Sequence, residues 1–349
     1  MSAANSILQN RFLRDQPQDD SYQHCSLYYC IIKQLGQGDN GQAYAAISKD
    51  AARLAIMKHE RKQTQAFFDE LRANLVAIKF AKPDNLEGDL TNEIIILTRE
   101  LTEANPCYTW ACNSTSDGPR RQWLALPFCN GGELGHFVHR YPGAVNPGFQ
   151  WHVLCELVRG VLYIFWGIDR PNQTAPQVGW PLLTHSDIYT CNLLLSTRSP
   201  SFGDYPSVVI ADFGRAEAEE PINPGSTSVS VSDDNFNNDV RGSIYLKELT
   251  EDIRCIGGVV DDIQADVAES GVQSGVPTAF QVNNMIELVL AQLRVFRARS
   301  IVQSIGFLHA VLEIAIEQRA ATYQPMPADA VAFLNAPKVS DRELLASMC

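Results

Sequence analysis

The spacing of apolar and polar residues changes along the chain, from strand-like in the first part to helix-like in the second. The segment YYCIIKQLGQGDNGQAYAAISKDAARLAIMKHE, residues 28–60, predicts a strand, a glycine turn, a second strand and a third strand that ends at Lys58. The segment TNEIIILTREL predicts a helix, and QWLALPFCNGGELGHFV predicts a strand followed by a glycine pair and a helix. After Gly257, apolar residues recur at helical spacing. The pattern therefore predicts an α+β protein with a β-rich first part and an α-rich second part.

We expect the chain to consist of three parts: a disordered N-terminal segment and two lobes. Residues 1–25 include QNRFLRDQPQDDSYQ, a polar run that predicts disorder. We expect a smaller β-rich lobe over residues 26–128 and a larger helical lobe over residues 129–349. The run from Ile222 to Asp239, rich in Ser, Asn and Asp, predicts a mobile segment within the larger lobe.

Composition excludes some functions and locations. The chain has 349 residues, 45% of them hydrophobic, and a formal net charge of −12. This charge argues against binding to nucleic acids or anionic membranes, whereas nucleotide binding depends on a few local cations. The run of about 18 apolar residues that a membrane span needs is absent, and the N-terminus does not resemble a secretory signal. Nine cysteines without CxxC spacing suggest reduced thiols in the cytoplasm or nucleus. We expect a monomer.

Two features of the first part suit phosphate binding. Gly36, Gly38 and Gly41 form G-x-G-x-x-G, and the strand that follows them fits a loop folded over phosphates better than a dinucleotide site. The glycines alone also fit a tight hairpin without a ligand. Lys58 ends an apolar strand behind this loop, where it could reach phosphates; its expected counter-ion is Glu93, with Glu70 as the rival.

The strongest signal lies in the second part, in THSDIYTCNLLLS and VVIADFGRAE. His185, Asp187 and Asn192 form His-x-Asp-x-x-x-x-Asn, and Asp212 begins Asp-Phe-Gly after an apolar strand. A carboxylate and an amide carbonyl are oxygen ligands that suit Mg²⁺, and a further carboxylate can orient a hydroxyl group. The order of these parts is typical of a phosphoryl-transfer site.

With the glycine loop and the lysine segment, these motifs resemble the eukaryotic protein kinase superfamily, in a divergent form. The insertion IDRPNQTAPQVGWPLLTHSD, which leads into the loop with Asp187, resembles one in kinase-like proteins of filamentous fungi. The resemblance covers about Cys30 to Gly257 and implies a bilobal fold, with a divergent activation segment at about residues 212–251. It implies that Asp187 orients the acceptor hydroxyl, that Asn192 and Asp212 hold Mg²⁺ or Mn²⁺, and that Lys58 anchors the phosphates of ATP. The residues it places at the nucleotide are Gly36, Gly38, Gly41, Ala55, Lys58, Glu93, Leu126, Pro127, Cys129, Glu133 and Leu194.

The chain departs from the family pattern near Asp187. Ser186 and Tyr189 stand where such loops usually carry Arg and Lys, which predicts slow transfer, and Arg215 is a candidate for the missing positive charge. The stretch RGSIYLKELTEDIRCIGG is shortened, with Tyr245 close to Asp252, which reduces the expected peptide-docking shelf. Three functions remain open: an ATP-dependent serine/threonine protein kinase with an unidentified protein substrate, a pseudokinase that binds nucleotide or acts as a scaffold, and a small-molecule phosphotransferase.

Overall fold

The computed structural model describes residues 20–38, 41–81, 89–97, 113–115, 123–170, 173–198, 200–219, 240–270 and 279–348. The chain divides into two compact units. Unit 1 consists of Met1–Arg99, Trp110–Phe128 and Pro337–Cys349, and unit 2 consists of Glu100–Thr109 and Cys129–Ala336. Most of unit 2 is thus one stretch, Cys129–Ala336, after which the chain returns to unit 1 at Pro337.

Unit 1 is built on an antiparallel sheet with the strand order β1-β2-β3-β5-β4. The strands are β1 Tyr29–Gln37, β2 Gly41–Ser48, β3 Leu75–Ala81, β4 Asn113–Thr115 and β5 Trp123–Pro127. Side chains of β2 alternate between two cores, because successive residues of a strand point to opposite faces. Ala45 and Ile47 join one apolar cluster, and Tyr44 and Ala46 join the other. β2 is therefore buried on both faces.

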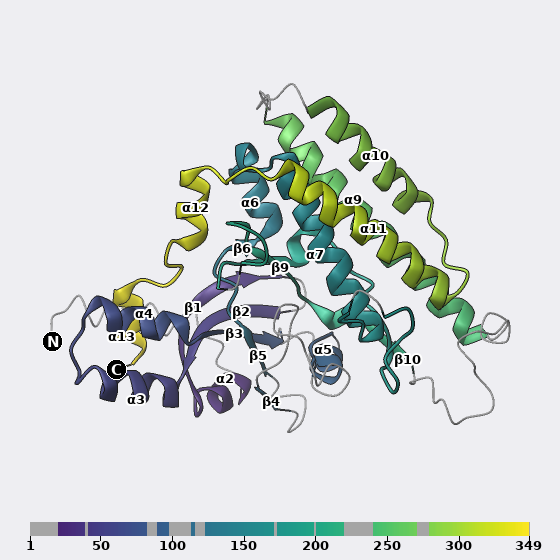
Figure 1. The fold of residues 1–349 in the computed structure, drawn as a ribbon. Helices are drawn as coiled ribbons and strands as arrows, with labels where there is room; N and C mark the ends of the chain where they lie inside the picture. Colours follow the sequence, from purple (N-terminus) through teal and green to yellow (C-terminus); the bar gives the residue numbers. More distant parts are fainter. Residues whose placement is uncertain are drawn as a thin grey trace. The chain divides into compact units, whose positions relative to one another are not determined.

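Two helices lie between β2 and β3, α3 Lys49–Lys58 and α4 Gln65–Ala73. The hydroxyl of Ser48 accepts a hydrogen bond from the Ala51 amide, and the hydroxyl of Thr64 accepts one from the Phe67 amide, so both helices begin at a capping residue. α3 and α4 run side by side and share the core with the sheet (Figure 1). The strand predicted to end at Lys58 is thus wrong, because residues 49–58 form a capped helix.

The C-terminal segment completes unit 1. Helix α13 Asp341–Ser347 begins with a capping box, in which Ser340 and Glu343 satisfy each other's backbone amides. It packs against α4 and β1, and Leu344 is buried in the cluster that contains Phe67, Phe68 and Leu71. The expectation that residues 129–349 form a single lobe is therefore wrong at its end, because apolar side chains of 337–348 complete the core of unit 1.

Two short helices flank the sheet of unit 1, α2 Asp20–Cys25 and α5 Asp89–Ile95. Cys25 is fully buried, and Trp123 donates a hydrogen bond from Nε1 to Nδ1 of His24 at 3.2 Å. The predicted disorder of residues 1–25 is therefore wrong for residues 20–25, which are ordered by packing on the sheet; residues 1–19 lie outside the described residues.

Unit 2 is organised around helix α7 Pro147–Trp166, in which all residues except Pro147 and Arg159 are buried. Asn146 caps its start by accepting a hydrogen bond from the Phe149 amide. There are two small antiparallel sheets. In one, β8 Leu193–Ser196 lies between β6 Gly132–Glu133 and β9 Ser207–Ile210; in the other, β7 Leu182–Thr184 pairs with β10 Glu217–Glu219. The remaining helices are α6 Leu134–Arg140, α9 Val240–Glu269, α10 Ala279–Val295, α11 Ile301–Thr322 and α12 Ala328–Asn335. The chain is thus an α+β protein with antiparallel sheets, as the residue pattern predicts.

Helix α11 is, in the part of the chain that the structure describes, the one helix long and apolar enough to cross a membrane by length and composition. Its buried residues recur every three or four positions, and this face packs against α7. A packed core helix meets the same two criteria.

Charged side chains lie buried where α7 and α11 meet. Nη1 of Arg319 lies 3.7 Å from Oε1 of Glu156 and 3.4 Å from Nδ1 of His152. Nε2 of His152 lies 2.8 Å from the carbonyl oxygen of Pro206, so this nitrogen carries the hydrogen and Nδ1 accepts from Arg319. Burial lowers the pKa of His152 to about 4, which keeps the ring neutral at physiological pH.

Candidate functional site

The loop with His185 and Asp187 follows β7 and is held by a buried carboxylate of helix α9. Oδ2 of Asp252 accepts a hydrogen bond from the His185 amide at 2.7 Å, and Oδ1 accepts one from the Ser186 amide at 2.8 Å. Ser186 has a φ of 60°, a left-handed conformation that costs a non-glycine residue free energy. The two hydrogen bonds that Asp252 accepts hold the backbone in this conformation, directly before Asp187.

The environment of Asp252 affects its charge. Burial raises the pKa of this carboxyl group to about 7, although the two backbone N–H donors act in the opposite direction. Its exposed fraction is 1%. A buried acceptor with two donors is costly to replace, because removing it would leave two amides without their acceptor.

Asp187 and Asn192 are joined within the loop. Nδ2 of Asn192 donates to the carbonyl oxygen of Asp187 and to its Oδ2, both at 2.9 Å. Because both partners are acceptors, the amide nitrogen must face Asp187 and Oδ1 must face the other way. Oδ1 has the Cys191 thiol, a weak donor, at 3.7 Å. The Asn192 side chain thus offers a carbonyl oxygen that could bind a cation.

The segment before Asp212 is clamped to this loop through Ala211. The Ala211 amide donates to the carbonyl oxygen of Asn192 at 2.9 Å, and Nε2 of His185 donates to the carbonyl oxygen of Ala211 at 3.1 Å. The rings of His185 and Phe213 meet edge to face, with centroids 4.7 Å apart. Asp212 itself has the left-handed angles φ 66° and ψ 72°. The structure therefore brings together Asp187, Asn192 and Asp212, three of the four predicted catalytic residues.

One cation lies beside Asp187. Arg215 ends the 3-10 turn Phe213–Arg215, and its Nη1 lies 3.6 Å from Oδ1 of Asp187. The exposed fraction of its side chain is 63%, so the pair contributes little to stability. Tyr189, in the same loop, is half exposed. Arg215 thus supplies positive charge that the loop itself lacks.

Three further predicted nucleotide residues lie in unit 2. Glu133 is the register partner of Leu194 in the pairing of β6 with β8, so these two residues are neighbours. Cys129 precedes this sheet, and its carbonyl oxygen accepts a hydrogen bond from the Gly132 amide at 3.3 Å. Burial raises the pKa of the Cys129 thiol to about 12, so the thiol remains neutral.

In unit 1, the predicted counter-ion Glu93 is paired with a different lysine. Nζ of Lys79, on β3, lies 2.6 Å from Oε2 of Glu93, on α5, and Glu93 is almost fully buried. Lys79 belongs to the run Leu75–Ala81, in which Ile78 and Phe80 are fully buried. A lysine beside a buried carboxylate at the centre of a sheet is a candidate phosphate ligand that sequence reasoning missed.

The prediction that Lys58 pairs with Glu93 is wrong. Lys58 ends α3, its side chain is largely exposed, and its Nζ lies 2.9 Å from Oε2 of Glu70, the rival counter-ion. Ala55 is also not placed as predicted, because it lies in the buried face of α3 and packs in the cluster with Phe67. The signal that could have identified Lys79 is the β-propensity of Leu-Val-Ala-Ile-Lys-Phe, directly after an amphipathic helix.

Leu126 and Pro127 end β5, opposite Ala77 and Val76 of β3, and both are half-buried. Their position on the strand next to Lys79 suits the predicted lining of a nucleotide pocket. Pro127 has no backbone N–H group, but it keeps a carbonyl oxygen that could accept a hydrogen bond from a nucleotide.

The three glycines of G-x-G-x-x-G differ in what they require. A Cβ atom at Gly41 would lie 2.6 Å from the carbonyl oxygen of Phe80, so the close approach of β2 and β3 explains this glycine. A Cβ atom at Gly36 or Gly38 would have no atom of the described residues within 4 Å. Packing within unit 1 therefore does not account for these two glycines.

Other parts of the predicted site are described only in part. The segment from Ile222 to Asp239 lies outside the described residues. The region that follows is one continuous helix, α9, in which Tyr245 is buried. The described residues contain no group of three or more His, Cys, Asp or Glu side chains that could hold a metal ion.

A scan against models of protein families found none that matches this chain, and a search of curated proteins found no similar sequence.

Proposed function

We propose that this chain is an ATP-dependent phosphotransferase of the protein kinase type, which transfers the γ-phosphoryl group of Mg-ATP to a Ser or Thr hydroxyl of a protein. The observation that carries the proposal is the hydrogen-bonded arrangement of Asp187 and Asn192, with Ala211 clamped to the same loop directly before Asp212. The division into a β-rich unit and a mainly helical unit supports a bilobal fold of this type.

Asp187 would orient the acceptor hydroxyl and accept its proton. Its carboxylate is fixed by the Asn192 amide, so one oxygen is held while the other faces Arg215. Fixing a base within hydrogen-bond reach of its substrate is the main requirement for this role. The left-handed backbone at Ser186 and the carboxylate of Asp252 position the loop.

The donor set fits a magnesium ion. Asn192 offers a carbonyl oxygen turned away from Asp187, and Asp212 offers a carboxylate next to the clamped Ala211. Mg²⁺ takes few protein ligands because it shares its shell with phosphates and water, which agrees with two oxygen donors rather than a larger cluster. When bound, the ion would neutralise charge that develops on the phosphates.

Lys79 replaces Lys58 as the residue proposed to anchor the phosphates. Glu93 holds its ammonium group at 2.6 Å, which orients a side chain that would otherwise sample many rotamers. Gly36 and Gly38 support the same role for the β1–β2 turn, because main-chain N–H groups can approach phosphate oxygens where no Cβ intervenes.

Arg215 would stabilise the charge of the transferred phosphoryl group. It is a cation at 3.6 Å from Asp187, in a loop where Ser186 and Tyr189 carry no charge. Removing one such electrostatic contact typically lowers the rate by about 10²-fold to 10³-fold.

A small-molecule acceptor is the second candidate, favoured by the burial of Tyr245 within helix α9. An exposed apolar ledge at this residue would have suited a peptide, and Tyr245 does not provide one. A kinase with a small hydroxyl acceptor would use the same Asp187.

Transfer of labelled γ-phosphate tests the proposal. The full chain is incubated with ATP and Mg²⁺ or Mn²⁺, with generic proteins and then with a panel of small hydroxyl metabolites. We expect incorporation that Asp187→Asn and Asp212→Asn both abolish. Nucleotide binding without turnover on any acceptor would instead indicate a pseudokinase, and absence of both binding and transfer would overturn the proposal.

A further inference from the structure

Helix α3 and the turn after it carry an exposed face that neither the core of unit 1 nor the proposed catalysis explains. The exposed fractions of Leu54 and Met57 are 61% and 66%. The side chains of Arg53, Lys58 and Lys62 are exposed by 72%, 68% and 71%. Two large apolar side chains thus lie among cations on the outside of one helix.

The opposite face of α3 is fixed. Ala52 and Ala55 are buried in the cluster with Phe67 and Leu71 of α4, so the helix cannot turn its apolar residues inward. Residues 60–64, which lie between α3 and α4, are all exposed. The exposed apolar residues are therefore presented by a rigid support, which lowers the entropic cost of binding a partner.

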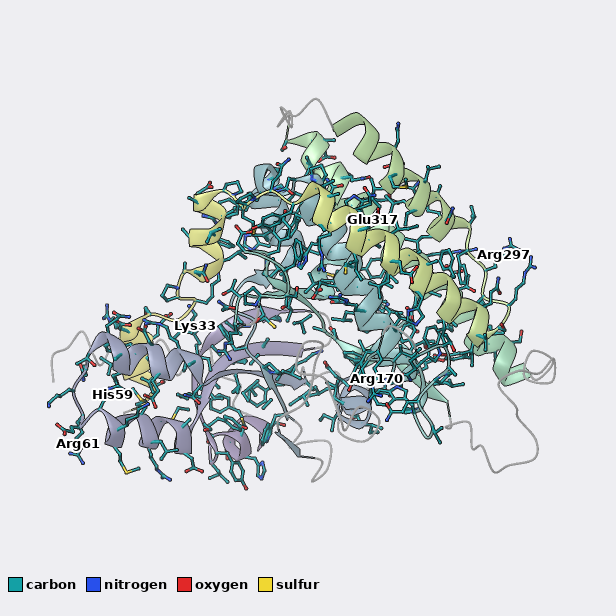
Figure 2. The ribbon with its side chains drawn as sticks, viewed as in Figure 1. Lys33, His59, Arg61, Arg170, Arg297 and Glu317 are labelled. Carbon is teal, nitrogen blue, oxygen red and sulfur yellow. The ribbon has the colours of Figure 1, made fainter. Side chains whose placement is uncertain are left out.

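The turn after α3 holds charged residues in an unfavourable backbone conformation. Glu60 and Arg61 have φ angles of 50° and 62°, and the Arg61 amide donates to the carbonyl oxygen of Ile56 at 3.0 Å. Glycine usually occupies such a position after a helix, because it has no Cβ to strain. Figure 2 shows His59 and Arg61 at the end of α3 that is farther from the sheet.

The charge of this face is opposite to that of the whole chain. Residues 49–62 contain five cations, Lys49, Arg53, Lys58, Arg61 and Lys62, against the two anions Asp50 and Glu60, in a chain of net charge −12. The Arg53–Asp50 and Lys62–Glu60 pairs are highly exposed, with atoms 3.3 Å and 2.8 Å apart. Exposed pairs of this kind are worth little and exchange easily for a partner's carboxylates. Lys58 also pairs with the less exposed Glu70, so its charge is partly compensated.

We propose that this surface, consisting of Arg53, Leu54, Met57, Lys58, Arg61 and Lys62, docks an acidic segment of a partner protein that carries apolar anchor residues. Carboxylates of the segment pair with the cations, and its apolar residues cover Leu54 and Met57. An anionic membrane is a poorer occupant, because an extended charged surface meets the field of the whole acidic molecule, whereas a peptide meets only this face. The proposal does not depend on phosphotransferase activity.

One helix face of this length buries less area than a standard interface, so we expect transient binding. The probe is a fluorescent synthetic peptide of about 12 residues, which is about 18 Å long as a helix and combines Glu and Asp with Leu and Phe at helical spacing. Two reference peptides have the Leu and Phe residues replaced by Ser, or the acidic residues replaced by Lys. Binding to the full chain is measured by fluorescence anisotropy at several salt concentrations.

Two sets of substitutions test the two parts of the surface. One variant combines Arg53→Glu, Arg61→Glu and Lys62→Glu; another combines Leu54→Ser and Met57→Ser. A control combines Arg170→Glu, Arg297→Glu and Arg299→Glu, three exposed arginines of unit 2 that give the same change in net charge. Figure 2 labels Arg170 and Arg297. Thermal unfolding checks that each variant is folded. We expect all of them to fold, because substitutions at exposed positions usually change stability little.

We expect Kd for the acidic apolar peptide to rise about tenfold or more in both surface variants and by less than about twofold in the control. The reference peptides should bind weakly to every form. The proposal is overturned if the peptide does not bind, if the control variant weakens binding as much as the surface variants, or if the chain binds vesicles of phosphatidylserine in preference to the peptide.

Discussion

Nζ of Lys79 lies 2.6 Å from Oε2 of Glu93, and the exposed fraction of the Glu93 side chain is 1%. The pair joins a central strand to helix α5 within unit 1. A carboxylate buried to this extent depends on its cation, because an unpaired buried charge is costly. The pair therefore has both a structural consequence and, in the proposed function, a catalytic one.

Replacing Lys79 should affect both stability and activity. Lys79→Met leaves Glu93 buried without this cation, which should lower the free energy of unfolding by about 3–5 kcal/mol, and should reduce phosphate transfer by about 10²-fold or more. Lys79→Arg should keep most of the stability. Urea unfolding and labelled-phosphate transfer measure the two effects.

Lys58→Met is the matched control. Its side chain is exposed and pairs with Glu70, so both stability and transfer should change little. A loss of transfer in Lys58→Met together with full activity in Lys79→Met would contradict our assignment.

Replacing Arg215 separates its catalytic role from its contact with Asp187. Arg215→Ala should lower kcat by about 10²-fold while the KM for ATP stays within about twofold, because the proposed contact forms only in the transition state. Lys at this position should restore part of the rate. Arg170→Ala, a change at another exposed arginine of unit 2, serves as control, and an unchanged kcat in Arg215→Ala would remove the proposed role.

Replacing Asp252 should displace the loop that contains Asp187. Asp252→Asn presents an NH₂ group to one of the amides of His185 and Ser186, so one hydrogen bond is lost and a donor faces a donor. We expect a loss of about 1–3 kcal/mol in stability, together with reduced transfer. Glu251→Gln, at the exposed neighbouring position, should have neither effect in the same two assays.

Stability should depend on the protonation of His152. Burial lowers the pKa of His152 from 6.5 to about 4. Between pH 6.5 and pH 4, the folded state therefore binds fewer protons than the unfolded state. The contribution is fully present above pH 6.5 and is lost as pH falls through 4, by up to roughly 3 kcal/mol. Asp252 and Glu156 have raised pKa values and act in the opposite direction.

The difference between wild type and His152→Gln isolates this effect. Unfolding free energies are measured from pH 7.5 to about 4 for both proteins. The advantage of the wild type should shrink as the pH falls, whereas a constant difference would show that His152 is not kept neutral by burial.

The C-terminal helix should contribute to the stability of unit 1. Leu344→Ala removes a side chain buried among Phe67, Phe68 and Leu71, and should lower the free energy of unfolding by about 2–5 kcal/mol. Arg342→Ala, on the exposed side of the same helix, should change it by less than about 0.5 kcal/mol. Equal effects of the two substitutions would show that α13 does not form part of the core.

The residue pattern predicts the α+β class and the division after residue 128, and it identifies the loop from His185 to Asn192. These features rest on local information, since Asp187 and Asn192 are five residues apart and their hydrogen bonds close within one loop. The pattern does not reveal the two-helix insertion between β2 and β3, because Leu54 and Met57 remain exposed and make α3 look like an apolar strand. Nor does it place residues 337–348, whose partners are more than 260 residues away in the chain.

By itself, the sequence determined the order and spacing of Asp187, Asn192 and Asp212. Only the tertiary structure decided which of two similar runs, Ala-Ile-Met-Lys at Lys58 or Ala-Ile-Lys at Lys79, forms the strand beside Glu93. A short apolar run has similar local preferences for strand and helix. The choice depends on hydrogen bonding to neighbouring strands, and Leu75–Ala81 has β2 on one side and β5 on the other, whereas residues 49–58 satisfy their backbone within α3.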